Sequence, residues 1–69
     1  MDIRRRVGLN LKRLREERGK SQEELAFDCD LHRTYVSGVE RGVRNPTVLV
    51  LGKLAKGLKV DPGEFFKAR

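Results

Sequence analysis

Two short predicted helices, joined by only three or four residues, constrain the fold of this chain more than any other feature of its sequence. Ser21-Gln22-Glu23-Glu24 has the residues of a capping box, so a helix should begin there and end near Asp28. Asp28-Cys29-Asp30 predicts a tight turn, because aspartate tolerates a left-handed backbone. A second helix should then run from about His32 to Glu40. Because so short a link cannot bring the helices antiparallel, we expect them to cross steeply.

Turn signals elsewhere predict three further helices. The first runs from about Ile3 to Glu17, and its apolar residues form one stripe of Ile3, Val7, Leu11 and Leu14. The fourth begins in the loop Arg44-Asn45-Pro46-Thr47, where Asn45 or Thr47 could be the cap and Pro46 is expected in the first turn. Its inward residues are expected to be Val48, Leu51, Leu54, Ala55 and Leu58. A short fifth helix should begin at Asp61-Pro62-Gly63-Glu64 and carry Phe65 and Phe66. We therefore expect an all-α fold, a compact five-helix bundle, with residues 1–69 forming a single domain.

The composition limits the function classes. A formal net charge of +6 favours a polyanionic partner such as nucleic acid. One cysteine and one histidine are too few for a structural zinc site or an internal disulfide, so we expect no metal and no cofactor. We expect no enzymatic activity, because the sequence has no Ser/His/Asp set and no glycine-rich phosphate loop. The longest apolar run, Val48–Leu51, is too short to span a membrane, and we expect a cytoplasmic protein with no membrane partner.

The predicted helix over 32–40 has two unlike sides. At about 100° per residue, one side carries two guanidinium groups, two hydroxyls and a glycine that would allow a close approach by DNA, from Arg33, Thr34, Ser37, Gly38 and Arg41. Val36 and Val39 lie on the opposite side. Arginine can pair with guanine and threonine can contact a base edge, so the polar side suits the major groove. The alternative interpretation is a solvated helix face. Together with the short link, the pattern is that of a helix-turn-helix over helices two and three.

Three longer segments extend this pattern along the chain. They are Leu11-Lys12-Arg13-Leu14-Arg15-Glu16-Glu17-Arg18-Gly19, Ser21-Gln22-Glu23-Glu24-Leu25-Ala26 and Glu40-Arg41-Gly42-Val43-Arg44-Asn45-Pro46-Thr47, followed by Leu51, Leu54-Ala55-Lys56 and Leu58-Lys59-Val60. In order and at matching spacing, they closely resemble the Cro/repressor-type helix-turn-helix family of phage and bacterial transcriptional regulators. Within that family, the segment Arg33–Gly42 is most similar to the controller proteins of restriction–modification systems, which are short dimers that regulate their own operon. The resemblance implies a lambda-repressor-like DNA-binding fold.

The resemblance also implies a role for individual residues. Arg33, Thr34 and Ser37 would contact bases, and the DNA backbone would be held by Gln22, Tyr35, Arg41 and Arg44. Tyr35 has an alternative role as a partly buried aromatic ring, and both can hold. Arg15 and Glu40 match a pair that forms an internal salt bridge in related repressors, with a solvated charge pair as the alternative. The competing function is a module that keeps the fold but binds a partner protein, as an antitoxin does.

Three residues depart from the family pattern. Asp30 stands where glycine is usual in the turn, His32 where serine or threonine commonly caps the third helix, and Gly57 where alanine is usual. We expect Asp30 to adopt the left-handed conformation and His32 to cap its helix poorly. Cys29 is expected to be a small, partly buried thiol rather than a redox switch.

Apolar residues that lie off the inward stripe predict an interface with a second copy of the chain. We expect a dimer surface that includes Val43, Leu49, Val50, Phe65 and Phe66, with only one of the two phenylalanines needed. The alternative is that Val50 and Phe66 enlarge the core. A two-fold homodimer would place two recognition helices about 34 Å apart on a palindromic operator in double-stranded DNA.

Overall fold

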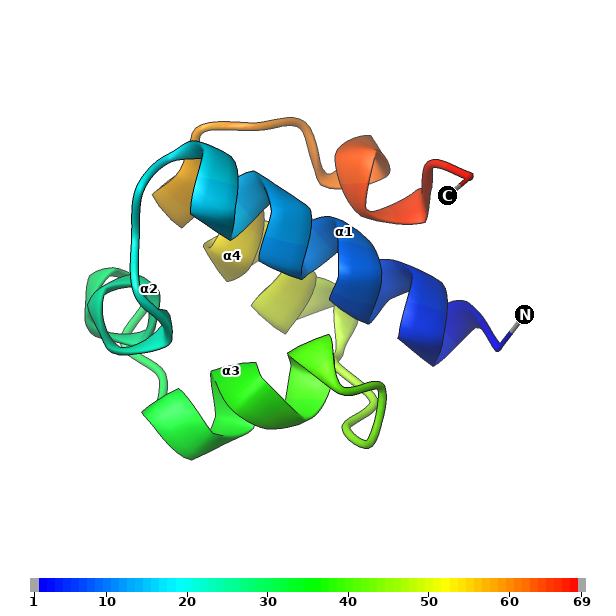
Figure 1. Ribbon diagram of the computed structural model, residues 1–69, viewed down its shortest axis with the longest axis horizontal. Helices are drawn as coiled ribbons and strands as arrows, with labels where there is room; N and C mark the ends of the chain where they lie inside the picture. Colours follow the sequence, from blue (N-terminus) through cyan, green and yellow to red (C-terminus); the bar gives the residue numbers. More distant parts are fainter. Residues whose placement is uncertain (1, 69) are drawn as a thin grey trace.

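The computed structural model describes residues 2–68, which form four α-helices and a final 3-10 turn and contain no strand (Figure 1). The elements are α1 (Ile3–Glu17), α2 (Gln22–Asp28), α3 (Arg33–Glu40), α4 (Val48–Leu58) and η1 (Pro62–Phe66). The all-helical fold is confirmed, but a fifth α-helix is not formed. Five residues that begin with Pro62 and Gly63 leave little room for i→i+4 hydrogen bonds, and the segment closes as the tighter 3-10 form. No helix within residues 2–68 has the length and apolarity needed to cross a membrane.

Local caps explain where most of these helices begin. Asp2 accepts a hydrogen bond from the backbone N–H of Arg4 at 2.8 Å and starts α1. Both halves of the predicted capping box are present, with Ser21 accepting from the Glu24 N–H at 3.0 Å and Glu24 accepting from the Ser21 N–H at 2.8 Å. Thr47 caps α4. His32 makes no side-chain capping bond to α3, as its poor capping ability predicts.

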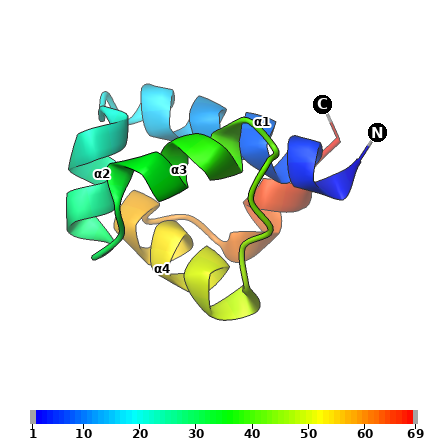
Figure 2. The same ribbon diagram turned by 90° about the horizontal axis from the view of Figure 1, so that it is seen from below.

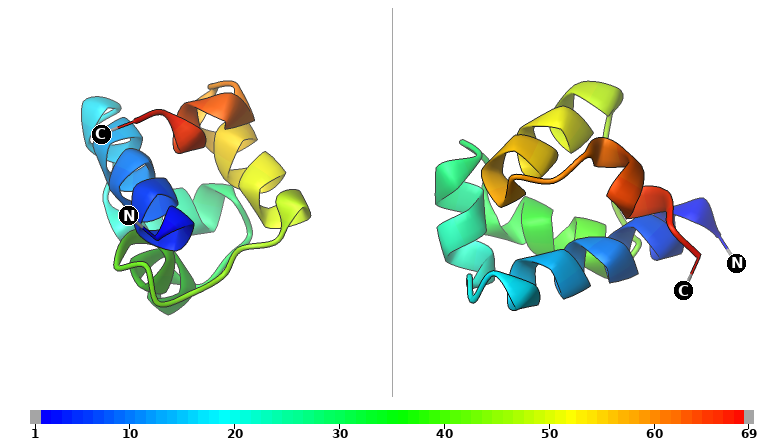
Figure 3. Two further views of the ribbon diagram at one scale, coloured as in Figure 1. Left: turned by 90° about the vertical axis from the view of Figure 1, so that its right-hand side faces the viewer. Right: turned by 90° about the horizontal axis from the view of Figure 1, so that it is seen from above.

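The core lies where α1 packs on α3 and η1, and where α2 packs on α3 and α4 (Figures 2 and 3). Its fully buried apolar side chains come from every element and include Leu11, Leu25, Val36, Val39, Leu54, Leu58 and Phe65. Two residues expected in the apolar stripes are exposed, namely Ile3 and Val48. Each is the first residue of its helix, where the helix has only just begun to pack on its neighbours.

Asn10 is buried in the middle of α1, where it ties the end of the described chain to this helix. Its amide nitrogen donates to the backbone carbonyls of Phe65 at 2.8 Å and Lys67 at 2.9 Å. The apolar pattern of α1 does not reveal this role, because the partners lie more than fifty residues away. The contact holds η1 against α1 and thereby fixes Phe65 in the core.

Gly8 allows α1 to approach the end of α3 closely. A Cβ atom at this position would come within 2.5 Å of the Glu40 carbonyl oxygen and closer still to that of Val39. The close approach places the C-terminal end of α3 directly against α1. It therefore fixes where the exposed side of α3 points.

Cys29 and Gly57 fit each other between α2 and α4. The Cys29 thiol is buried and donates to the Lys53 carbonyl at 3.4 Å. A Cβ atom on Gly57 would lie 2.5 Å from the sulfur, so a glycine here makes room for the thiol. This explains why the usual alanine is absent at residue 57. Burial, followed by the nearby Asp28 carboxylate, raises the pKa of the thiol above its ordinary value.

Candidate nucleic-acid interface

The link between α2 and α3 is a tight turn with a left-handed residue. Asp30 has φ of 57°, which confirms the expected conformation, and its N–H donates to the Phe27 carbonyl. The N–H of Leu31 donates to the Ala26 carbonyl at 2.8 Å and closes the end of α2. In Figure 1, α2 is seen nearly end-on while α3 lies across the view, so the two helices cross steeply, as the short link predicts.

The two sides of α3 differ as the helical periodicity predicts. Val36 and Val39 are fully buried against the core, whereas Arg33 and Thr34 are exposed and Ser37 is half-buried. A helix held by one buried side can present the other side rigidly, because little of its backbone is free to move. The three candidate base-contacting residues are therefore available on a fixed helix, with Ser37 the least accessible.

Arg44 lies across α3 and changes the role expected for Gly38. A Cβ on Gly38 would come within 2.5 Å of the Arg44 Cγ, so the glycine is buried beneath the arginine stem. The Arg44 guanidinium carbon lies 5.8 Å from the centroid of the half-buried Tyr35 ring, a cation–π distance. The expectation that Gly38 permits a close approach by DNA is wrong, because the protein's own side chain occupies that space.

The backbone on either side of α3 reinforces this arrangement. The N–H groups of Val43 and Arg44 donate to the Gly38 carbonyl at 3.0 and 3.2 Å. Gly42 has φ of 78°, a conformation that glycine adopts without strain, and it turns the chain back over the helix. Arg41, the C-cap of α3, is exposed. The two candidate backbone-contacting arginines thus follow directly from the end of α3.

A buried ion pair joins α1 to α3. Arg15 Nε donates to Glu40 Oε2 at 2.7 Å and Arg15 Nη2 donates to Glu40 Oε1 at 3.1 Å. The Glu40 side chain is 4% exposed and that of Arg15 11%, so the pair is not a solvated charge pair. The hydrogen bond to Glu40 raises the pKa of Arg15. The pairing implied by the family resemblance is present in this structure.

Gln22 joins the same pair, which sequence reasoning did not anticipate. Its amide Nε2 donates to Glu40 Oε1 at 3.0 Å, and Arg15 Nη1 donates to the Lys20 carbonyl at 2.8 Å, just before the cap of α2. The network therefore ties the beginning of α2 to the end of α3. No local signal reveals it, since Gln22 and Glu40 are 18 residues apart.

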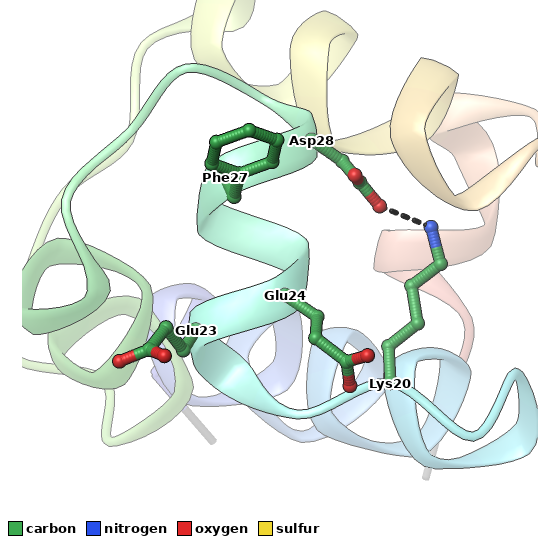
Figure 4. Close-up of a pocket in the computed structure, with 5 residues that line it drawn as sticks. All are labelled: Lys20, Glu23, Glu24, Phe27 and Asp28. Atoms are coloured by element: carbon green, nitrogen blue, oxygen red, sulfur yellow. Dashed lines mark hydrogen bonds and ion pairs between the residues drawn. The ribbon is translucent and has the colours of Figure 1, made fainter.

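The outer side of α2 carries a hollow of about 400 Å³ with acidic walls (Figure 4). Glu23, Glu24 and Asp28 line this hollow together with Phe27, whose side chain is 85% exposed, and Lys20 pairs with Asp28. Carboxylates repel phosphates, so this side of α2 is unsuited to DNA. Gln22, the candidate phosphate contact on α2, is not among the residues that line this hollow.

The candidate dimer residues divide into three groups. Val43, Leu49 and Phe66 are exposed, with Leu49 at 80%, whereas Val50 is half-buried and packs on the core. Phe65 is fully buried, so placing it in the interface is wrong. In a 3-10 turn, adjacent residues point about 120° apart, and here only Phe65 points inward. Val48, expected in the core, is 84% exposed beside Leu49 and enlarges the apolar surface.

The comparisons with known proteins agree with this architecture. A family model described as helix-turn-helix matches residues 11–65, and the chain belongs to the helix-turn-helix family. The control protein C.BamHI of Bacillus amyloliquefaciens is 45% identical over 62 residues, which cover 88% of this chain and 76% of that protein. The resemblance to restriction–modification controller proteins is thus confirmed.

Solved structures extend the likeness to three dimensions. The restriction-modification controller protein C.AhdI from Aeromonas hydrophila matches with a TM-score of 0.89 at 46% identity, covering 91% of this chain and 96% of that one. The controller protein C.Esp1396I, as a tetramer in complex with its natural 35 base-pair operator, matches with a TM-score of 0.86 at 41% identity, covering 96% of this chain and 87% of that one.

Proposed function

We propose that this protein is a sequence-specific, double-stranded DNA-binding regulator of transcription, with α2 and α3 as its helix-turn-helix and α3 in the major groove. One observation carries the proposal: α3 is fully buried along Val36 and Val39 while it exposes Arg33 and Thr34. A rigid helix with exposed groups that match base edges suits major-groove recognition. Residues 1–69 would act as one DNA-binding domain in the bacterial cytoplasm, without catalytic activity.

Within this proposal, the exposed side chains take two roles. Arg33, Thr34 and Ser37 contact bases and determine the sequence preference. Contacts to the DNA backbone come from Gln22, Tyr35, Arg41 and Arg44. Such contacts set the position and orientation of the protein on the duplex without selecting a sequence. The Arg44 guanidinium lies over Tyr35, so these two residues would bind the backbone as one unit.

We further propose that the protein binds a palindromic operator as a homodimer. Val43, Leu49 and Phe66 are exposed apolar residues, and Val50 is half-buried against the core. Large apolar side chains that a domain leaves exposed often mark a protein interface when they lie together, which supports the proposal. Sedimentation equilibrium tests the proposal, and a protein that stays monomeric at about tens of micromolar would contradict it.

A role as controller of a restriction–modification operon is the most specific form of the proposal. It is supported by the similarity to C.BamHI and C.AhdI, and by the C.Esp1396I tetramer that is bound to its operator. The DNA-facing set of Gln22, Arg33, Thr34 and Arg41 favours this role over a module that binds only protein. Selection of bound sequences from random duplex DNA would give the operator, which should then occur upstream of the protein's own gene.

Salt and substitution test the proposed interface. A dimer that touches roughly 6–10 phosphates should lose about 10³–10⁵ in affinity between roughly 50 and 200 mM salt. Arg33→Ala should cost about 1–3 kcal/mol and relax the base preference at one position. Lys12→Ala, which removes an exposed cation from the outer side of α1, is the control and should leave the preference unchanged. Arg33→Ala protein with the wild-type preference and affinity would show that the assigned base contact is wrong.

A further inference from the structure

We propose that Glu40 is a positioning residue for DNA binding: its buried carboxylate holds the Gln22 amide in place for a phosphate contact, and Arg15 neutralises that carboxylate. This inference rests on the proposed function, in which Gln22 contacts the DNA backbone. Glu40 itself does not touch DNA. It acts through the 3.0 Å hydrogen bond that its Oε1 accepts from Gln22 Nε2.

Both oxygens of the Glu40 carboxylate accept hydrogen bonds from protein groups. Oε2 accepts from Arg15 Nε at 2.7 Å, and Oε1 accepts from both Arg15 Nη2 at 3.1 Å and Gln22 Nε2 at 3.0 Å. A primary amide has two N–H donors, and this hydrogen bond uses only one of them. The half-buried Gln22 therefore keeps a second N–H that can be donated to a phosphate while the first remains bound to Glu40.

Fixing Gln22 in advance favours binding for an entropic reason. A free glutamine side chain samples many rotamers, and a contact with DNA would have to select one of them. In this protein the hydrogen bond to Glu40 makes the selection before DNA arrives, so less ordering accompanies complex formation. Glu40 is itself held by two hydrogen bonds from one planar guanidinium, which allow it little freedom.

Arg15 is necessary for a second, electrostatic reason. An unpaired carboxylate near the proposed phosphate site would repel the DNA backbone. The positive guanidinium of Arg15 balances that negative charge through the bidentate ion pair, in which both side chains are largely buried. Arg15 also donates to the Lys20 carbonyl at 2.8 Å, one residue before the cap of α2. The backbone that leads to Gln22 is thus fixed by the same guanidinium.

The shortened variant Glu40→Asp tests the inference. The aspartate keeps the charge beside Arg15 but withdraws the carboxylate by one methylene, which should release Gln22. We expect operator affinity to fall about tenfold, as it should for Gln22→Ala, and both losses should be the same on nonspecific duplex DNA. The Glu40→Asp, Gln22→Ala double variant should bind no more weakly than Gln22→Ala alone. The matched control, Glu16→Asp, shortens an exposed glutamate on α1 and should bind as wild type does.

A second variant guards against unfolding, and a second measurement separates positioning from stability. Arg15→Met with Glu40→Leu replaces the buried pair by apolar residues, a change that often preserves stability. NMR relaxation of the Gln22 side-chain amide in the free protein should show restricted motion in wild type and faster, larger motion in both Glu40 variants. Changes in unfolding free energy alone would leave that amide unchanged.

The outcomes distinguish this inference from the function on which it rests. If the losses from Glu40→Asp and Gln22→Ala multiply to about a hundredfold, Glu40 acts through another group and the inference is overturned. It is also overturned if the Gln22 amide is equally mobile in wild type and in the Glu40 variants. If Gln22→Ala binds as wild type does while Arg33→Ala does not, the inference fails and the DNA-binding function stands. If the wild-type protein binds no duplex DNA, both are overturned.

Discussion

Replacing Gly8 with alanine should destabilise the domain by forcing α1 away from α3. The added Cβ would lie 2.5 Å from the Glu40 carbonyl oxygen, about 1 Å inside the usual carbon–oxygen separation of about 3.3–3.6 Å. Overpacking costs about 1–3 kcal/mol, and the upper end applies here because the obstacle is backbone. Alanine returns about 1 kcal/mol through its higher helix propensity. The expected net loss is about 2 kcal/mol, roughly half of the stability of a domain this small.

Urea unfolding followed by far-UV circular dichroism measures this loss. With a denaturant slope of about 1 kcal/mol per molar, the unfolding midpoint of Gly8→Ala should fall by about 2 M. Gly52→Ala is the matched control, because its Cβ would meet no atom within 4 Å on the exposed side of α4. It should raise stability by about 0.5–1 kcal/mol. A Gly8→Ala midpoint equal to or above that of wild type would refute the packing argument.

Gly57→Ala should cost about 1–2 kcal/mol of stability, because its Cβ would lie 2.5 Å from the Cys29 sulfur. Adding Cys29→Ala to the same chain should recover most of this loss in urea unfolding, and losses that simply add would contradict the argument. Lys59→Gly should stabilise the domain by up to about 1 kcal/mol, since Lys59 ends α4 with φ of 58°, and an unchanged melting temperature would count against strain there. Cys29 should react with iodoacetamide much more slowly in the folded protein than in urea at pH 8, because burial raises the pKa of its thiol. The folded state favours the protonated thiol, so stability should decline as the pH rises above the ordinary thiol pKa, and Cys29→Ala should lose that decline.

The beginning of α2 could be predicted because its signal is local, and the beginning of α4 could be predicted to within the two candidate caps Asn45 and Thr47. The capping box at Ser21 acts within four residues, and the Thr47 cap acts within the first turn of α4. The buried side of α3 also follows from periodicity alone. The left-handed conformation of Asp30 could also be predicted, because aspartate is one of the few residues that adopt a left-handed backbone readily.

The remaining features depend on partners that are remote in sequence. A single apolar stripe does not reveal that Asn10 is buried and bonded to the carbonyls of Phe65 and Lys67, or that Val48 is exposed. The choice between Phe65 and Phe66 depends on the 3-10 geometry of their turn, which propensity does not specify. In the candidate interface, the exposed residues of α3 could be predicted, whereas the network that holds Gln22 could not.

The packing of α3 on one side only also bears on how new DNA specificities can arise. Arg33 and Thr34 contribute nothing to the buried side of the helix, so a population of sequences can vary them without repacking the domain. Gly38 and Glu40 have no such freedom, because one accommodates Arg44 and the other pairs with Arg15. A designer who transplants a foreign recognition sequence should therefore exchange the first turn of α3 and retain its last. Related regulators in one cell can come to recognise different operators by the same route, one exposed residue at a time.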